Sequence, residues 1–309
     1  IQAGSIQAGP VQAGSVQAGP VQAGSIQTGG VLTGEGLYAL LSHRLEVAET
    51  AGIEAIGYRP CAVFDADGTL WAGDLTTSLV QEVLAEGAVR DEARAPFNAL
   101  LTRYGEPPGQ TAELAIRRLE QAYTGGRLYA FAEARGIPRA QVDLEVWPSY
   151  NWVFSGWKPD EVQARARALW ARDFHRQVFV GLTPVIDLLR AHGLRVVVVS
   201  AALEPALLVA TSHLGFDPAA VRGMRSGVSE GRLTPEIEPP VLFSEGKLEV
   251  VHALCGGRPL AVFGDSVASS DAGMLEDAWL AVAVEPRGRH LDRARDRAFP
   301  VVRFASPRE

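Results

Sequence analysis

Cysteine and histidine are scarce in this sequence, and their positions form no pattern that binds a metal. The chain of 309 residues contains 2 cysteines and 6 histidines. Cys61 and Cys255 match neither a disulfide framework nor the paired CxxC spacing of a zinc site, and the histidines are scattered without ligand spacing. We therefore expect two buried, inert thiols rather than a crosslink or a cysteine metal centre.

Excess positive charge and long apolar runs are also absent. The formal net charge is −7, and Lys and Arg form no stripe, which argues against nucleic acid as the main partner. No apolar run approaches the ~18 residues that a membrane span needs. No secretory signal is visible, so we expect a cytoplasmic protein, although a start at Ile1 rather than Met leaves export with a removed leader open.

The first 35 residues contain too few large apolar side chains to build a core. They consist of the pentads IQAGS, IQAGP, VQAGS, VQAGP, VQAGS, IQTGG and VLTGE, each with Ile or Val first and Gly fourth. This composition predicts a flexible low-complexity tail over residues 1–35. A docked extended arm or an oligomerisation segment is the alternative, and we assign no chemistry to the tail.

Beyond the tail, patterns typical of strands alternate with patterns typical of helices. The runs CAVF, LRVVVVS, PLAVFGDS, AWLAVAV and FPVVRF predict strands, whereas LYALLSHRLEVAE, VIDLLRAHG and GKLEVVHALCGG have helical spacing. The alternation predicts an α/β fold with a Rossmann-like parallel sheet. Residues 72–181 are helical in pattern and too many for one crossover, so we expect a core over 36–71 and 182–309 and an inserted, mostly helical cap domain over 72–181.

Two aspartates follow the first strand of that core, in the stretch VFDADGTLWAGD. Ligands of open α/β sheets bind at the carboxyl ends of the strands, where Asp65 is expected. Residues i and i+2 of an extended segment point the same way, so Asp65 and Asp67 can converge on one ligand. Because two close carboxylates repel each other, the pair indicates a hard metal ion, a nucleophile with an acid–base partner, or both.

Other polar residues stand where later strands end or helices begin. Ser200 ends the run VVVVS and could hold an anion beside the start of the next helix. Lys247 lies at a helix start, which is unfavourable for a cation, and a solvated lysine is the alternative. Asp265 ends the strand of AVFGDS, while Asp271 could equally be the N-cap of the following helix.

The ordered set of DxDGT, Ser, Lys and GDS with a later Asp resembles the motifs of the haloacid dehalogenase superfamily of phosphotransferring enzymes. The insertion point is similar to that of the phosphoserine phosphatase branch, and SAA at 200–202 is similar to phosphorylcholine phosphatases. The resemblance implies that Asp65 is the nucleophile, that Asp67 is the general acid and base, and that Ser200 and Lys247 hold the transferred phosphoryl group. It also implies Mg²⁺, bound by Asp65, the main-chain carbonyl of Asp67, and Asp265.

The fourth motif departs from the pattern of that family. Asp265 and Asp271 are farther apart in the sequence than usual, so Asp271 is assigned either to the metal or to the groups that support its ligands. Ser269 or Ser270 is the alternative to Asp271 in this role, and we assign Ser270, like Asp271, either to the metal or to the groups that support its ligands. Four residues beside the motifs or in the insert are assigned to substrate binding, namely Thr69, Ala201, Asp74 and Trp152.

Two of these assignments concern the leaving group. Asp74 lies about where phosphoserine phosphatases carry an acidic residue for the substrate ammonium, and the alternative is that it caps the helix beginning LTTSLVQEVL. Trp152 belongs to WPSYNWVFSGW, which predicts either the core of the cap or part of an aromatic cage for a quaternary ammonium. We therefore expect an amino- or choline-bearing phosphomonoester.

The chemistry expected of these residues is hydrolysis of a small phosphorylated metabolite. A carboxylate that attacks phosphorus must approach a dianion, so Mg²⁺ and Lys247 are needed to offset the charge. Asp67 can protonate the alkoxide leaving group and then take a proton from the water that cleaves the aspartyl phosphate. Transfer to an alcohol acceptor is the alternative reaction, and a non-catalytic phospholigand-binding protein is the alternative class.

Overall fold

A seven-stranded parallel sheet forms the centre of the computed structural model, which describes residues 31–50 and 60–304. Its order is β1-β9-β8-β7-β2-β3-β4. The bounds are Val31–Leu32 for β1, Cys61–Phe64 for β2, Arg195–Leu203 for β3, Val221–Met224 for β4, Ala261–Gly264 for β7, Leu280–Val284 for β8 and Val301–Val302 for β9. The predicted α/β fold with a parallel sheet is confirmed.

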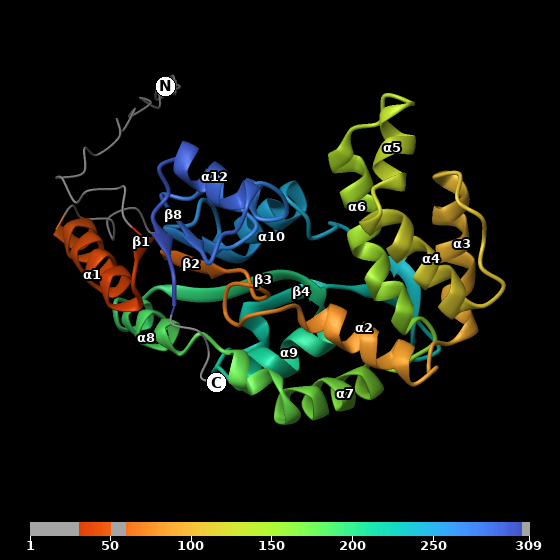
Figure 1. Cartoon of the computed structure of the whole chain (residues 1–309). Helices are drawn as coiled ribbons and strands as arrows, with labels where there is room; N and C mark the ends of the chain where they lie inside the picture. The colour runs from red at the N-terminus through yellow and green to blue at the C-terminus, as the bar shows by residue number, and fades with distance from the viewer. Residues whose placement is uncertain (1–30, 51–59, 305–309) are drawn as a thin grey trace, which may run out of the picture.

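Helices cover both faces of this sheet (Figure 1), which explains why most residues of its strands are apolar. In β2, Ala62 and Phe64 pack on one face, while Cys61 and Val63 pack on the other, and all four are fully buried. The first face is covered by α1 (Gly34–Thr50), α8 (Thr183–Ala191) and α9 (Glu204–Ser212). The second is covered by α10 (Glu245–Cys255), α11 (Ala272–Asp277) and α12 (Arg289–Asp296).

The long segment between β2 and β3 is helical, as its periodicity predicts. It contains α2 (Leu75–Ala85), α3 (Arg94–Arg103), α4 (Ala112–Thr124), α5 (Arg127–Glu133), α6 (Arg139–Ser149) and α7 (Pro159–Arg172) before α8. Short 3-10 turns connect them, including η3 (Tyr150–Phe154). Figure 1 shows α3 to α6 standing beside the sheet, with α2 and α7 next to α9. We refer to residues 72–181 as the insert.

A β-hairpin that the sequence patterns do not predict connects the core to the insert. Strands β5 (Ser226–Ser229) and β6 (Arg232–Ile237) pair antiparallel. The main chain of Leu233 exchanges two hydrogen bonds with the insert, accepting from Gly156 N at 2.8 Å and donating to Trp157 O at 2.8 Å. The insert is therefore fixed to the core through backbone hydrogen bonds as well as through side chains.

The predicted boundary of the repeat tail is too late in the chain. Val31 and Leu32, in the last pentad, form the edge strand β1 and pair in parallel with Val301 and Val302 of β9. The helix α1 then begins at Gly34. Residues 1–30 lie outside the described residues, so the expectation of a flexible tail remains a prediction for that part alone. No helix within residues 31–50 and 60–304 has the length and apolar character needed to cross a membrane.

The expectation of two free thiols is wrong. Cys61 and Cys255 form a disulfide across a sequence separation of 194 residues. Cys61 begins β2 and Cys255 ends α10, and both lie in the apolar layer between this helix and the sheet. Only the packing of α10 on the sheet brings the two together, which is why their spacing in the sequence gives no indication of the bond.

Removal of the disulfide should destabilise the fold. We expect a variant with both cysteines changed to alanine to lose about 2–4 kcal/mol of unfolding free energy, because the unfolded chain is no longer crosslinked over a long loop. Denaturant curves with and without reductant measure this: reductant should lower the stability of the wild type and leave the variant unchanged. If both cysteines of the unreduced, unfolded wild type react as thiols, the bond does not form.

Candidate active site

Three adjacent strands bring the predicted polar residues to one edge of the sheet. Strand β2 lies between β7 and β3, with Phe64 in register with Phe263 of β7 and with Val198 of β3. Asp65 follows β2, Asp265 follows β7, and Ser200 lies near the end of β3. Because all three strands are parallel, the side chains that follow them meet at the carboxyl end of the sheet. The structure thus brings Asp65, Ser200 and Asp265 to one cavity.

The turn after β2 orients the second aspartate. Asp67 Oδ1 accepts hydrogen bonds from Trp71 Nε1 at 2.7 Å and from the backbone N–H of Leu75 at 2.9 Å. Gly68 has φ +76°, in the left-handed region, and a Cβ there would lie 2.5 Å from Asp265 Oδ2. The glycine of the DxDGT motif is thus required both by the turn and by the approach of the turn to Asp265.

A buried ion-pair network connects the helix α10 to the strand ends. Lys247 Nζ, in the first turn of α10, lies 2.7 Å from Asp65 Oδ1 and 2.6 Å from Asp271 Oδ1. The three side chains are nearly inaccessible to solvent. Burial alone would lower the pKa of Lys247, but the negative charges of Asp271 and Asp65 outweigh it and raise that pKa. Lys247 is therefore a buried cation and not the solvated lysine that was the alternative.

Three carboxyl groups of the site have raised pKa values, so they bind protons more readily than ordinary aspartates. Burial raises the pKa of Asp65 to about 7, with the charge of Asp271 adding to the rise and Lys247 opposing it. Burial, and then the charges of Asp271 and Asp65, raise the pKa of Asp265 well above its usual range. Burial and the charge of Asp74 do the same to the pKa of Asp67, against the hydrogen bonds from Leu75 and Trp71. The site therefore has more negative charge than its protein neighbours neutralise.

This excess of charge fits a hard divalent cation. Asp65, Asp265 and Asp271 each offer a ligand atom, and these atoms lie within 4.8 Å of one another. Oxygen atoms of carboxylates are the ligands that Mg²⁺ prefers. A bound cation would favour the ionised forms of Asp65 and Asp265 and so oppose the rise of their pKa values.

Asp271 joins the site despite the unusual spacing of its motif. It is fully buried, and its Oδ2 accepts a hydrogen bond from the backbone N–H of Ser266 at 3.0 Å. Asp271 directly precedes the first residue of α11, but its side chain makes no capping hydrogen bond to that helix. Ser270 Oγ lies 3.4 Å from Asp271 Oδ1 and supports this carboxylate rather than replacing it.

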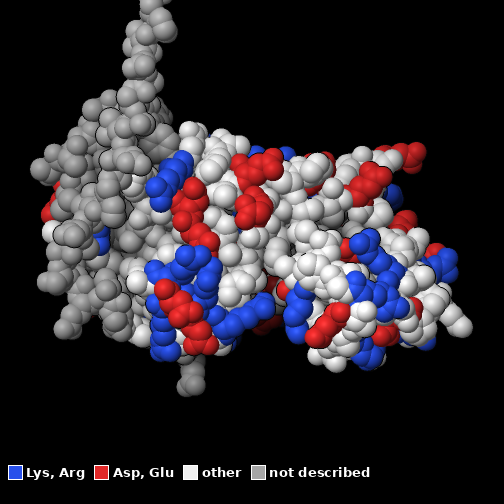
Figure 2. Space-filling model, turned by 90° about the horizontal axis from the view of Figure 1, so that it is seen from above, with Lys and Arg blue, Asp and Glu red and all other residues white. Residues whose placement is uncertain are grey.

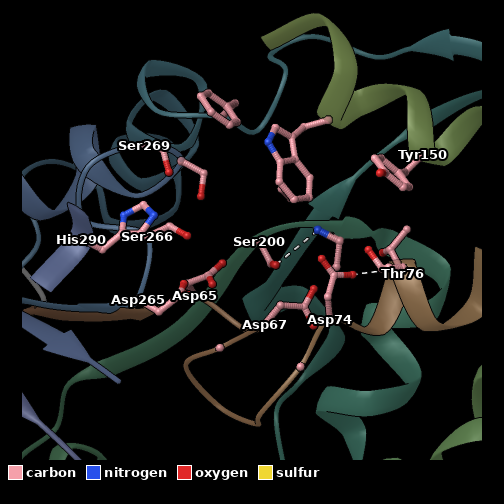
Figure 3. Close-up of a pocket in the computed structure, with 18 of the residues that line it drawn as sticks. Asp65, Asp67, Asp74, Thr76, Tyr150, Ser200, Asp265, Ser266, Ser269 and His290 are labelled. Carbon is pink, nitrogen blue, oxygen red and sulfur yellow. Dashed lines mark hydrogen bonds between the residues drawn. The ribbon is translucent and has the colours of Figure 1, made fainter. Parts of the chain in front are cut away.

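These residues face a cavity of about 440 Å³ between the sheet edge and the insert (Figure 3). The predicted site residues that line it are Asp65, Asp67, Asp74, Ser200, Ala201, Lys247, Asp265 and Ser270. Figure 2 shows the molecule hollowed between its two parts when it is seen from above, with Lys and Arg residues at the edges of the hollow. The side of the cavity near the sheet is rich in carboxylates, and two exposed arginines, Arg287 and Arg289, also line the cavity.

Two residues predicted to bind substrate lie elsewhere. Thr69 is fully buried, does not line the cavity, and donates its backbone N–H to Ala66 O within the turn. Trp152 packs edge to face on Phe97, with ring centroids 5.5 Å apart, and also does not line the cavity. For Trp152 the alternative, a place in the core of the insert, is correct, because its helical turn directs the ring toward α3.

Other aromatic residues of the insert face the cavity instead. Trp147 and Tyr150 line it, with ring centroids 5.8 Å apart, and Tyr123 packs against Trp147 from α4. Figure 3 shows the ring of Tyr150 on the side of the cavity opposite to Ser269 and His290. Trp147 and Tyr150 belong to the same aromatic stretch of the sequence as Trp152. Which of these rings point into the cavity is decided by the helix α6, which ends at Ser149, and by the turn η3 after it.

Asp74 caps a helix and also faces the cavity. It is the N-cap of α2, accepting from the backbone N–H of Thr77 at 2.6 Å. Its carboxylate also lines the cavity, near Asp67 in Figure 3. Burial raises the pKa of Asp74, and the hydrogen bonds from Thr77 and Thr76 oppose the rise.

Comparisons with known proteins agree with this geometry. The family model described as haloacid dehalogenase-like hydrolase matches residues 62–276. A solved structure of a protein with unknown function from Bordetella pertussis Tohama I is 22% identical, covering 79% of this chain and 98% of that chain, with a TM-score of 0.53. A conserved functionally unknown protein from Anaerococcus prevotii DSM 20548 is 16% identical, covering 79% of this chain and 85% of that chain, with a TM-score of 0.52.

These two structures share the fold described above. A phosphoserine phosphatase solved as an analogue of its phospho-aspartyl intermediate also aligns, at 18% identity over 81% of this chain and 95% of that chain, with a TM-score of 0.46. The search of curated proteins finds no match.

Substitution of Gly68 by alanine should damage the carboxylate cluster. Gly87 is a matched control, because it also has a left-handed φ of +62° but nothing within 4 Å of its would-be Cβ. The control should lose about 1–2 kcal/mol of unfolding free energy from its backbone conformation alone. Gly68→Ala should lose more, and should also lose affinity for Mg²⁺ in calorimetric titration, because Asp265 must move. Equal losses of stability and unchanged Mg²⁺ binding in both variants would show that the close approach is unimportant.

Proposed function

Because this chain belongs to the haloacid dehalogenase-like hydrolase family, we propose that it hydrolyses a small phosphomonoester in a Mg²⁺-dependent reaction that passes through a phosphorylated Asp65. One arrangement carries the proposal. A buried carboxylate at the end of a central strand, Asp65, lies 2.7 Å from a buried ammonium, Lys247, and lines the same cavity as a second carboxyl group with a raised pKa, Asp67. A nucleophile, a phosphate-binding cation and a proton donor thus face one space.

In the first step of this proposal, Asp65 attacks the phosphorus atom. A bond forms between a carboxylate oxygen and phosphorus, and the bond from phosphorus to the substrate oxygen breaks. The leaving alkoxide takes a proton from Asp67. Both hydrogen bonds to the Asp67 carboxyl group end on Oδ1, so Oδ2 is the oxygen left for this proton. Lys247 and the hydroxyl of Ser200 hold the phosphoryl oxygens.

In the second step, water attacks the phosphorus of the acyl phosphate on Asp65. Asp67, now ionised, accepts a proton from this water, and the Asp65 carboxylate leaves with the electrons of the O–P bond. Inorganic phosphate is released and both aspartates return to their initial states. An alcohol in the place of water would give a phosphotransferase, which remains the alternative reaction.

Asp65, Asp265 and Asp271 would hold the magnesium ion, together with the main-chain carbonyl of Asp67 that the family resemblance implies. When bound, Mg²⁺ supplies positive charge that offsets the repulsion between the carboxylates and a phosphate dianion. Asp271 Oδ1 lies 2.6 Å from Lys247 Nζ. Asp271 therefore also fixes the position of the ammonium group that would hold the phosphoryl group.

Amide substitutions separate the two aspartates. Asp65→Asn should abolish turnover of an aryl phosphate, since an amide cannot form the acyl phosphate, while circular dichroism shows an intact fold. Asp67→Asn should slow both steps, by about 10²–10⁴-fold in line with the loss of a general acid and base, and should leave phosphorylated Asp65 detectable by intact mass. Near-normal turnover of Asp65→Asn, or activity that persists in excess chelator, would contradict the mechanism.

We further propose that the leaving group carries a cationic amine or choline. Asp74 and Tyr150 face the same cavity, and the charge of Asp74 contributes, after burial and Glu120, to raising the pKa of Tyr150 to about 12. Trp147 adds a further aromatic residue, which is 40% exposed although large aromatic residues are usually covered. An anionic group beside exposed aromatic faces is the environment that attracts an ammonium ion, where cation–π contacts are worth about 0.5–2 kcal/mol.

Asp74→Asn isolates the charge of this residue from its capping role, because Asn is as good an N-cap as Asp. We expect the variant to keep its melting temperature while its preference for phosphocholine and phosphoethanolamine over neutral sugar phosphates falls by about tenfold in kcat/KM, the equivalent of ~1.4 kcal/mol. Steady-state kinetics on both substrate classes give the ratio. A wild-type preference for neutral or anionic leaving groups, or an unchanged ratio in Asp74→Asn, would refute a cationic subsite at Asp74.

A further inference from the structure

The loop between Asp265 and Asp271 is fixed at its two ends by contacts with nearby residues. At its start, the backbone N–H of Ser266 donates to Asp271 Oδ2 at 3.0 Å. At its end, the backbone of Ser244 donates to Ser270 O at 2.8 Å. Inside the loop, Ser269 N donates to Ser266 O at 2.9 Å. Among the described residues, the backbone N–H of Ala268, in the middle of the loop, has no hydrogen-bond acceptor within the loop itself.

His290 supplies that partner from another part of the sheet edge. Its Nδ1 accepts a hydrogen bond from the backbone N–H of Ala268 at 3.0 Å. His290 lies in the first turn of α12, which follows β8, so it reaches the loop from a neighbouring strand connection. The ring is partly buried and lines the cavity, and Figure 3 shows it beside Ser266 and Ser269.

This contact requires a neutral imidazole with its proton on Nε2, because Nδ1 must offer a lone pair to accept the bond. The surroundings favour that form. Burial and then the positive charge of Arg289 lower the pKa of His290, while the charge of Asp271 opposes them. The acceptor is therefore available near neutral pH.

We propose that His290 is a positioning residue for the metal site, which holds the long loop after β7 by its middle and so keeps Asp265 and Asp271 beside Asp65. The wide spacing between these two aspartates is the reason that such a support is needed. A longer loop has more conformations, so without a fixed midpoint the two carboxylates would converge less often. Among the described residues, His290 has no hydrogen bond or ion pair with either carboxylate, and it acts through Ala268. The inference rests on the Mg²⁺ site of the proposed function.

The experiment measures metal binding directly, without substrate. Binding of Mn²⁺ is followed by electron paramagnetic resonance, and binding of Mg²⁺ by calorimetry, in the full chain. His290→Ala and His290→Leu both remove the acceptor, and Leu keeps most of the volume of the ring. His290→Asn keeps an acceptor oxygen close to the position of Nδ1. His43→Ala, at an exposed position on α1, is the matched control.

We expect His290→Ala and His290→Leu to bind both ions about tenfold more weakly, the lower end of the effect of removing groups that support metal ligands. His290→Asn should recover affinity to within about threefold of the wild type, and His43→Ala should not differ from it. If His290→Ala does not fold, His290→Leu gives the same comparison without a cavity. Melting temperatures in chelator identify any variant whose fold has changed.

Two outcomes would overturn the inference while the proposed function stands. One is wild-type affinity for both ions in His290→Leu. The other is an increase of KM for the substrate with unchanged metal affinity, which would make His290 a substrate contact. A wild type that binds neither ion but still hydrolyses phosphomonoesters would instead contradict the metal site itself, and with it both proposals.

Discussion

Burial of like charges at the end of a parallel sheet is the constraint on which the site depends. Asp65, Asp265 and Asp271 lie within reach of one ion, and one buried ammonium, Lys247, contacts two of them. Small residues make this crowding possible. Gly68 allows the turn to pass against Asp265, and a Cβ at Gly264 would lie 2.7 Å from Asp271 Oδ2. The glycines of both motifs are thus part of the electrostatic design, because they let charged groups approach one another.

The two sides of the cavity have different chemistry. The sheet edge concentrates carboxylates that need a cation and a nearby ammonium, which suits a phosphoryl group. The insert contributes aromatic rings and one carboxylate, that of Asp74, which caps α2. This combination suits an organic leaving group that carries a positive charge. Since the first side comes from strand ends and the second from helices of the insert, changes in the insert could alter the leaving group without altering the phosphoryl chemistry.

The sequence predicts the sheet and most residues on the sheet side of the cavity, because hydrophobic periodicity and short motifs can be read from neighbouring residues. Asp65, Ser200 and Asp265 follow apolar runs, and parallel strands align their ends. Residues that depend on the third dimension escape prediction. The bond between Cys61 and Cys255 needs the packing of α10 on the sheet, and the choice of Trp147 over Trp152 needs the direction of a helix. The motif places Asp271 near the metal ligands, but its contacts with Lys247 and Ser266 appear only when its loop folds back.

The β5–β6 hairpin has a consequence for which molecules can reach the site. Its backbone bonds to Gly156 and Trp157 would have to break before the insert could swing away from the sheet. Such bonds are costly to lose without replacement. We therefore expect the cavity of about 440 Å³ to keep its dimensions through the reaction cycle. A cavity of fixed dimensions would admit a small free molecule more readily than a side chain on the surface of a folded protein.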